Sequence, residues 1–87
     1  MLNNGYDRNL YYSLWDGYWM SYRINSEAAI QIALQRVPGQ VIKVELDHED
    51  GILIYEIDIR TQTGVYEVHV HAATGQILKV EREDDWV

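Results

Sequence analysis

Four stretches in the second half of the chain alternate between apolar and polar residues. Alternation with a period of two is typical of a half-buried β-strand, because successive side chains point to opposite faces of the sheet. It predicts strands near residues 41–47, 52–60, 65–72 and 76–82. Turn-forming residues separate them, at Glu49-Asp50-Gly51, Gln62-Thr63-Gly64 and Thr74-Gly75. Such short connections make neighbouring strands antiparallel, since a parallel crossover needs roughly a dozen residues or more.

A helical period precedes the strands, over about residues 26–36. The apolar positions are Ala28, Ala29, Ile32, Ala33 and Val37. Asn25 or Ser26 suits the N-cap, and Pro38-Gly39 ends the helix. A sheet with one apolar face needs a cover, and this helix is the available one, docked by Ile32 and Ala33. We therefore predict an α+β domain with one helix packed on a four-stranded antiparallel β-meander.

Residues 1–23 differ in composition, since they contain five of the seven tyrosines and two of the three tryptophans. We divide the chain into an aromatic-rich N-terminal extension, residues 1–23, and a folded domain, residues 24–87. Asp16-Gly17 between apolar residues favours a hairpin in the extension. A short helix is equally compatible, because one helical stripe contains Tyr11, Trp15, Tyr18 and Tyr22. Disorder is a third possibility.

The overall charge restricts the class of partner. Fourteen acidic residues stand against seven basic ones, for a formal net charge of −7. Nucleic-acid affinity depends mainly on neutralising phosphates with Lys and Arg, so we expect no nucleic-acid partner. No apolar run approaches the ~20 residues that span a bilayer. The absence of cysteine excludes disulfides and thiolate sites.

The first residues bear on localisation. Met1 is followed by Leu2-Asn3-Asn4-Gly5, which has neither the basic start nor the apolar run of a signal peptide. The sequence as written therefore predicts a cytoplasmic protein. A secreted or cell-envelope location is the alternative if Met1 is not the natural start.

The candidate catalytic groups do not form a recognisable constellation. The carboxylates Glu45, Glu56, Asp58 and Glu67 fall at positions expected to be exposed, where nothing tunes a pKa for acid–base work. Two of the three serines lie in the extension and the third is a candidate cap. The sequence has no Gly-rich phosphate loop and no nucleophile elbow. We predict that the protein is not an enzyme, has no catalytic residue and needs no cofactor.

Two histidines share one face of the third predicted strand. His69 and His71 are two residues apart, and Glu56 or Asp58 of the neighbouring strand should lie beside them. A tetrahedral metal site needs three or four converging ligands and groups that orient them. We therefore predict no metal site and solvated imidazoles. The weak candidates for a metal or small ligand are His69, His71 and Glu56.

The aromatic extension contains the candidate partner-binding residues. These are Tyr11, Trp15, Tyr18, Trp19 and Tyr22. Tyr and Trp often anchor interfaces, because each buries a large area with few rotatable bonds. The extension can instead cover an edge of its own sheet, or pair between two copies in a homodimer.

The run from Ile24 to Glu83 resembles the PepSY domain. The matching features are Asn25-Ser26-Glu27-Ala28-Ala29 with Ala33, Pro38-Gly39-Gln40-Val41, Asp50-Gly51 followed by Tyr55-Glu56-Ile57, and Tyr66-Glu67-Val68 with Ala72-Ala73-Thr74-Gly75. One departure is His71, where family members often place Asp. The resemblance implies a PepSY or cystatin-like fold without catalytic activity. It also implies a protein partner, since the family occurs in propeptides of thermolysin-like metallopeptidases and in small stand-alone bacterial proteins.

The leading hypothesis is therefore a protein-interaction module that inhibits or modulates a peptidase or a cell-wall enzyme. One alternative is a structural, self-associating protein that forms a dimer. Another is metal or small-ligand binding on the face of His69 and His71.

Overall fold

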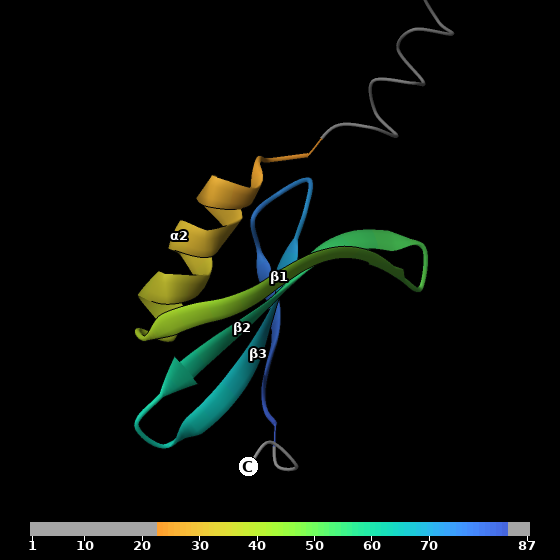
Figure 1. Cartoon of the computed structure of the whole chain (residues 1–87). Helices are drawn as coiled ribbons and strands as arrows, with labels where there is room; N and C mark the ends of the chain where they lie inside the picture. Colours follow the sequence, from red (N-terminus) through yellow and green to blue (C-terminus); the bar gives the residue numbers. More distant parts are fainter. Residues whose placement is uncertain (1–22, 84–87) are drawn as a thin grey trace, which may run out of the picture.

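A computed structural model describes residues 23–83 of the chain. The predicted extension, residues 1–23, lies outside the described residues apart from Arg23, and so does the question of hairpin or helix. The described elements are helix α2 at Ser26–Arg36 and strands β1 at Gln40–Glu49, β2 at Ile52–Thr61, β3 at Gly64–His71 and β4 at Ile77–Arg82 (Figure 1). The predicted helix and all four predicted strands are confirmed, with small shifts at their ends.

The four strands form one sheet in the order β1-β2-β3-β4, and every neighbouring pair is antiparallel. This confirms the predicted meander. Between β1 and β2 the turn residues Asp50 and Gly51 both have positive φ, of 53° and 79°. Such angles are typical of the two-residue turn that matches the twist of a hairpin. The helix lies across one face of the sheet and contacts β1, β2 and β3 (Figure 1).

Local interactions fix both ends of α2. At its start, the Asn25 side chain accepts a hydrogen bond from the Ala28 N–H at 2.8 Å, so Asn25 is the N-cap. One residue earlier, the Ile24 N–H donates to the Ala72 carbonyl at 2.7 Å and ties this end to the chain just after β3. At the other end, Gly39 passes so close to β2 that an added Cβ would lie 2.4 Å from the Arg60 carbonyl oxygen. Only glycine fits this approach without movement of the backbone.

The core lies between α2 and the sheet. Ala29 and Ala33 are fully buried, and their small side chains let the helix approach the strands closely. The other buried residues of this cluster come from β2, from β3 and from the residue directly after β3: Tyr55, Ile57, Ile59, Val68, Val70 and Ala72. Ala33 docks the helix as predicted, but Ile32 is only partly buried. Its Cδ1 lies 3.0 Å from where a Cβ on Gly75 would stand, so Ile32 packs over the β3–β4 turn.

Among the described residues, no helix has the length and hydrophobicity needed to cross a membrane.

Candidate functional site

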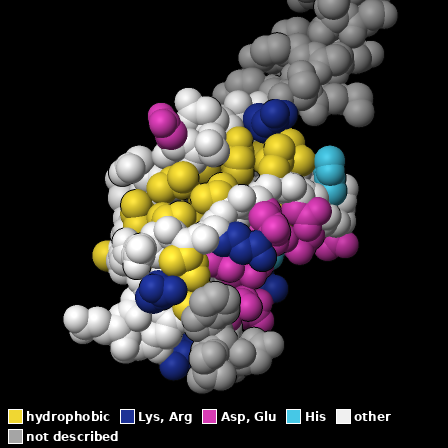
Figure 2. All heavy atoms as spheres, viewed as in Figure 1, with side chains coloured by type: hydrophobic (Ala, Val, Ile, Leu, Met, Phe, Trp, Pro, Cys, Tyr) yellow, Lys and Arg dark blue, Asp and Glu magenta, His cyan; other side chains and the backbone are white. Residues whose placement is uncertain are grey.

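Acidic residues concentrate on the face of the sheet that points away from α2, which we call the outer face. Strand alternation and register assign to it Lys43, Glu45, Asp47, Glu49, Ile54, Glu56, Asp58, Glu67, His69, Lys79 and Glu81. Acidic side chains gather on one side of the molecule in Figure 2. Like charges also lie directly opposite each other, as in the pairs Glu45–Glu56 and Asp58–Glu67. Opposed like charges destabilise a sheet, and such violations are expected at functional sites.

His69 lies at the centre of the outer face. Its flanking strands place Glu56 on one side and Lys79 on the other. The residue is only 4% exposed, so the prediction of a solvated surface imidazole is wrong for His69. Alternation predicts which face of the sheet a residue occupies, but not how deeply it is buried there. On the inner strand β3, the longer side chains of the two flanking strands cover the His69 ring. His69 also borders a shallow cavity of about 180 Å³, which Glu49, Ile54 and Leu78 help to line.

Both ring nitrogens of His69 face carboxylates. Nε2 lies 2.5 Å from Oε2 of Glu67, within hydrogen-bond distance. Nδ1 lies 3.7 Å from Oε1 of Glu49, which is an ion-pair distance if the ring is protonated. The Glu67 contact runs along β3, whereas Glu49 reaches across from the end of β1. The imidazole is therefore held on one side and faces a second, exposed carboxylate on the other.

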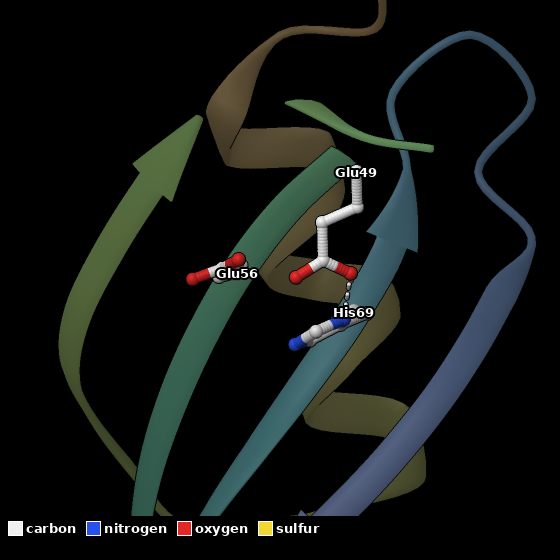
Figure 3. A group of neighbouring side chains, drawn as sticks. All are labelled: Glu49, Glu56 and His69. Atoms are coloured by element: carbon white, nitrogen blue, oxygen red, sulfur yellow. Dashed lines mark ion pairs between the residues drawn. The ribbon is translucent and has the colours of Figure 1, made fainter. Parts of the chain in front are cut away.

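Three side chains from three strands converge at this point. Glu49, Glu56 and His69 each offer one ligand atom, and these atoms all lie within 4.8 Å of one another. In Figure 3 the Glu49 carboxylate extends over the sheet toward the His69 ring, with Glu56 beside them on β2. Two weak metal candidates from the sequence, His69 and Glu56, are thus brought together.

The third candidate, His71, does not join this group. Its Nδ1 accepts a hydrogen bond from the Ala73 N–H at 3.1 Å, so its ring supports the turn after β3. Glu49 is the third member of the group instead of His71. The sequence pattern did not indicate Glu49, because the first strand is predicted to end near residue 47. β1 in fact continues to Glu49, which keeps Glu49 in phase with Glu45 and Asp47. Extending the alternation by two residues would have found it.

The carboxyl groups around His69 respond differently to their surroundings. Burial and the negative charge of Glu67 raise the pKa of the Glu56 carboxyl above its ordinary value. The same two causes raise the pKa of Asp58. Partial burial also acts to raise the pKa of Glu67, but its hydrogen bond with His69 helps to hold that pKa below the ordinary value. The ionised form is therefore favoured at Glu67 and disfavoured at Glu56.

A second surface lies on the helix side of β1. Val44 and Leu46 pair with Ile57 and Tyr55 of the core, so they face the same side as α2. They are nevertheless 37% and 42% exposed. We call Val44 and Leu46, with the β1 backbone between them, the β1 strip. It is an apolar surface on an edge of the sheet formed by residues 40–82.

The partner-binding residues predicted in the extension are not part of either surface as described. Tyr11, Trp15, Tyr18, Trp19 and Tyr22 all lie outside residues 23–83. Their role stays a prediction.

Comparison with known proteins places the fold in a wider group. Residues 23–81 match the family described as "PepSY: Peptidase propeptide and YPEB domain". The uncharacterised protein YkoJ of Bacillus subtilis (strain 168) is 40% identical over 62 residues, which are 70% of this chain and 36% of that protein. A crystal structure described as a lipoprotein of Clostridium difficile 630 is similar with a TM-score of 0.71 and 30% identity. That match covers 72% of this chain and 41% of the other, so this chain spans less than half the length of both relatives.

Proposed function

This chain belongs to the PepSY family, and on that premise we propose that it is a non-catalytic protein-interaction module that modulates a peptidase or a cell-wall enzyme. The family's description names peptidase propeptides, which supports a peptidase as the partner. The observation that carries the proposal is the β1 strip. An apolar, exposed strand edge is a template on which another chain can add a strand.

Strand β1, which contains the β1 strip, has the length and regularity that strand addition requires. After a bulge between Val41 and Lys43, β1 pairs with β2 without interruption as far as Glu49. Every residue from 43 to 49 is exposed. Backbone hydrogen bonds would supply affinity, and the alternating side chains would supply specificity.

The opposite edge of the sheet is less suited to this role. β4 has six residues, and its pairing with β3 is interrupted at Leu78 by a shift of register. Its outward side chains Lys79 and Glu81 form an ion pair at 3.2 Å. β1 also has a bulge and outward charges, so the difference lies in length: β1 has ten residues and β4 has six, and short edge strands are one way in which natural sheets prevent edge-to-edge association.

The two faces of β1 define the chemistry of the partner. A strand added to β1 meets Val44 and Leu46 on the helix side, and Glu45 and Asp47 on the outer face. The complementary segment therefore alternates apolar residues with Lys or Arg. Opposite charges across neighbouring strands each contribute about 0.2–1 kcal/mol relative to Ala pairs, so such a sequence is favoured over an acidic one.

The proposal is tested by mapping a partner onto the sheet. Amide signals of the isotope-labelled chain are followed by NMR while a thermolysin-like metallopeptidase or, separately, a cell-wall hydrolase is added. We expect changes along residues 43–49 and their loss in Leu46→Glu. The matched control is Leu78→Glu, because Leu78 is 43% exposed on the other edge. No binding to either enzyme class, or equal losses in both variants, would contradict the proposal.

Self-association is a second candidate, favoured by the aromatic content of residues 1–23 rather than by β1. In a symmetric antiparallel pair centred on Leu46, Glu45 of one copy would face Asp47 of the other. Like charges in that position repel, and the net charge of −7 adds to the repulsion. A dimer would therefore form through the extension.

A further inference from the structure

The starting observation is the unequal environment of the two ring nitrogens of His69. A carboxylate only accepts hydrogen bonds, so the 2.5 Å contact with Glu67 means that Nε2 carries the hydrogen. In the neutral ring Nδ1 then holds the lone pair. Among the described residues no hydrogen bond reaches Nδ1, and its nearest carboxylate oxygen, Oε1 of Glu49, is 3.7 Å away. Buried polar atoms are normally satisfied, and the His69 side chain is only 5% exposed.

We propose that Glu49, Glu56 and His69 form a binding site for a divalent first-row transition metal ion, with Nδ1 of His69 as the nitrogen ligand. This site is separate from the β1 strip, because it lies on the outer face of the sheet. It joins the end of β1 to β2 and β3 (Figure 3).

The distances suit such an ion. Tetrahedral ligands about 2.1 Å from a metal lie about 3.4 Å from one another. Nδ1 of His69 and Oε1 of Glu49 are 3.7 Å apart. One ring nitrogen of His69, one carboxylate oxygen of Glu49 and one of Glu56 all lie within 4.8 Å of one another. The Glu49 side chain is half exposed, so a small rotation brings its carboxylate into range.

The contact between His69 and Glu67 supports this assignment. Metal-binding histidines almost always donate their other ring N–H to a carboxylate, a carbonyl or a water. This hydrogen bond fixes the tautomer and turns the free nitrogen toward the metal. Glu67 is not a ligand in this arrangement but a positioning residue.

The surrounding charges also favour a cation. Glu56 lies directly opposite Glu45 of β1, and Glu49 and Glu67 both lie within 3.7 Å of the neighbouring His69 ring. The two described lysines on the outer face, Lys43 and Lys79, have their ammonium groups engaged with Glu45 and Glu81. Because these lysines are already paired, a bound cation would offset the repulsion between Glu56 and the neighbouring carboxylates.

The donor set selects the class of metal. Ca²⁺ and Mg²⁺ prefer all-oxygen sites, whereas an imidazole nitrogen with carboxylate oxygens suits Zn²⁺ and related transition metals. Three protein ligands leave one position of a tetrahedral ion open. That position is available to water or to a donor group from a partner.

The test uses the full chain, stripped of metal with a chelator and titrated with Zn²⁺ by calorimetry. We expect one ion per chain. Loss of a group that merely orients a ligand weakens metal binding about 10–100-fold, so Glu49→Gln and Glu56→Gln should each weaken it at least about tenfold. The matched control is Glu45→Gln, which removes the same charge directly opposite Glu56 but no ligand. It should change the affinity by less than about threefold, since it acts only through screened charge.

A second variant identifies the imidazole, because His69 is buried and its replacement risks unfolding the sheet. His48→Gln/His71→Gln leaves His69 as the only one of the three histidines. Zn²⁺ binding should persist, and Zn²⁺ should shift the ¹⁵N signal of Nδ1 of His69. The proposal is overturned if Zn²⁺ does not bind. It is equally overturned if Glu45→Gln weakens binding as much as Glu49→Gln, or if binding disappears in the double variant.

Discussion

The phenolic hydroxyl of Tyr55 donates a hydrogen bond to the backbone carbonyl of Ile24, with 2.7 Å between the two oxygens. Tyr55 is buried in the middle of β2, and Ile24 directly precedes the N-cap of α2. The bond therefore fixes the point at which the chain enters the helix. It links parts of the domain that are far apart in the sequence.

Tyr55→Phe should lower the free energy of unfolding by about 0.5–1.5 kcal/mol, the usual net contribution of one hydrogen bond. Urea denaturation measures this loss. The control is Tyr66→Phe, because within residues 23–83 the Tyr66 hydroxyl forms its hydrogen bond with the Thr63 hydroxyl, at 3.0 Å and exposed to solvent. Its loss should be clearly smaller. Equal losses would mean that the Ile24 contact does not hold the helix.

Gly39→Ala should destabilise the fold by about 1–3 kcal/mol, because the new methyl group overpacks against the Arg60 carbonyl and the Ile59 side chain. Thermal unfolding provides the measurement. Gly51→Asn is the matched control: nothing lies within 4 Å of an added Cβ there, and asparagine tolerates positive φ. A tolerated Gly39→Ala would show that the loop before β1 does not approach β2 so closely.

Asp58→Asn should stabilise the chelator-treated protein at pH 7, by about 0.2–1 kcal/mol, because it removes a carboxylate that faces Glu67. The pKa of Asp58 is raised in the folded state, chiefly by burial. A raised pKa means that folding favours the protonated form. The contribution of Asp58 to the free energy of unfolding is therefore fully present at low pH. It is lost as the pH rises through the pKa that Asp58 has in the folded state.

The gain from Asp58→Asn should accordingly disappear below about pH 4, where Asp58 is itself protonated. Denaturation curves recorded from about pH 3 to pH 8, a range that includes the ordinary carboxyl pKa, measure the direction of this pH dependence. Glu27→Gln is the contrasting control. Glu27 lies in the first turn of α2, where a negative charge is favourable, so its neutralisation should cost a little stability at pH 7. A gain from both variants would indicate a general effect of net charge.

Residues 1–23, which apart from Arg23 lie outside the described residues, are rich in aromatic side chains. Seven aromatic side chains at a segment charge of zero favour burial over hydration, so we expect Trp15 and Trp19 to be buried. Fluorescence of a Trp86→Phe variant should then be blue-shifted from that of hydrated indole. Light scattering on the full chain and on a chain that begins at Ile24 distinguishes the two modes of burial. A dimer lost on truncation assigns the extension to an interface, and a monomer in both cases assigns it to the chain's own fold.

The fold was predictable because its two periodicities do not overlap. The spacing of Ala29 and Ala33 indicates a helix, and the alternation around Ile57 and Val68 indicates strands. The turns at Asp50-Gly51 and Gly64 are short enough to force the meander. The docking of the helix was less predictable, because Ile32 and Ala33 are adjacent on the apolar stripe and only packing decides which of them lies deepest.

The candidate site was predicted only in part. Alternation places His69 and Glu56 on one face, but it gives neither the depth of His69 nor the reach of Glu49 across from another strand. Both depend on side-chain lengths and on the diagonal spacing between strands, which a linear pattern does not contain. The position of His71 was not predictable for a related reason, since its contact with Ala73 is set by the turn after β3.

The order of the strands has a consequence for the folding rate. Each strand pairs only with its neighbours in the sequence, so every hairpin can close without waiting for a distant segment. Domains dominated by such local contacts fold faster than those that must first close long loops. The hydrogen bonds of Ile24 with Tyr55 and Ala72 are exceptions, because each joins the start of the domain to a distant strand or turn. We therefore expect rapid, single-exponential refolding in which the sheet assembles by zipping and the entry of the helix is secured last.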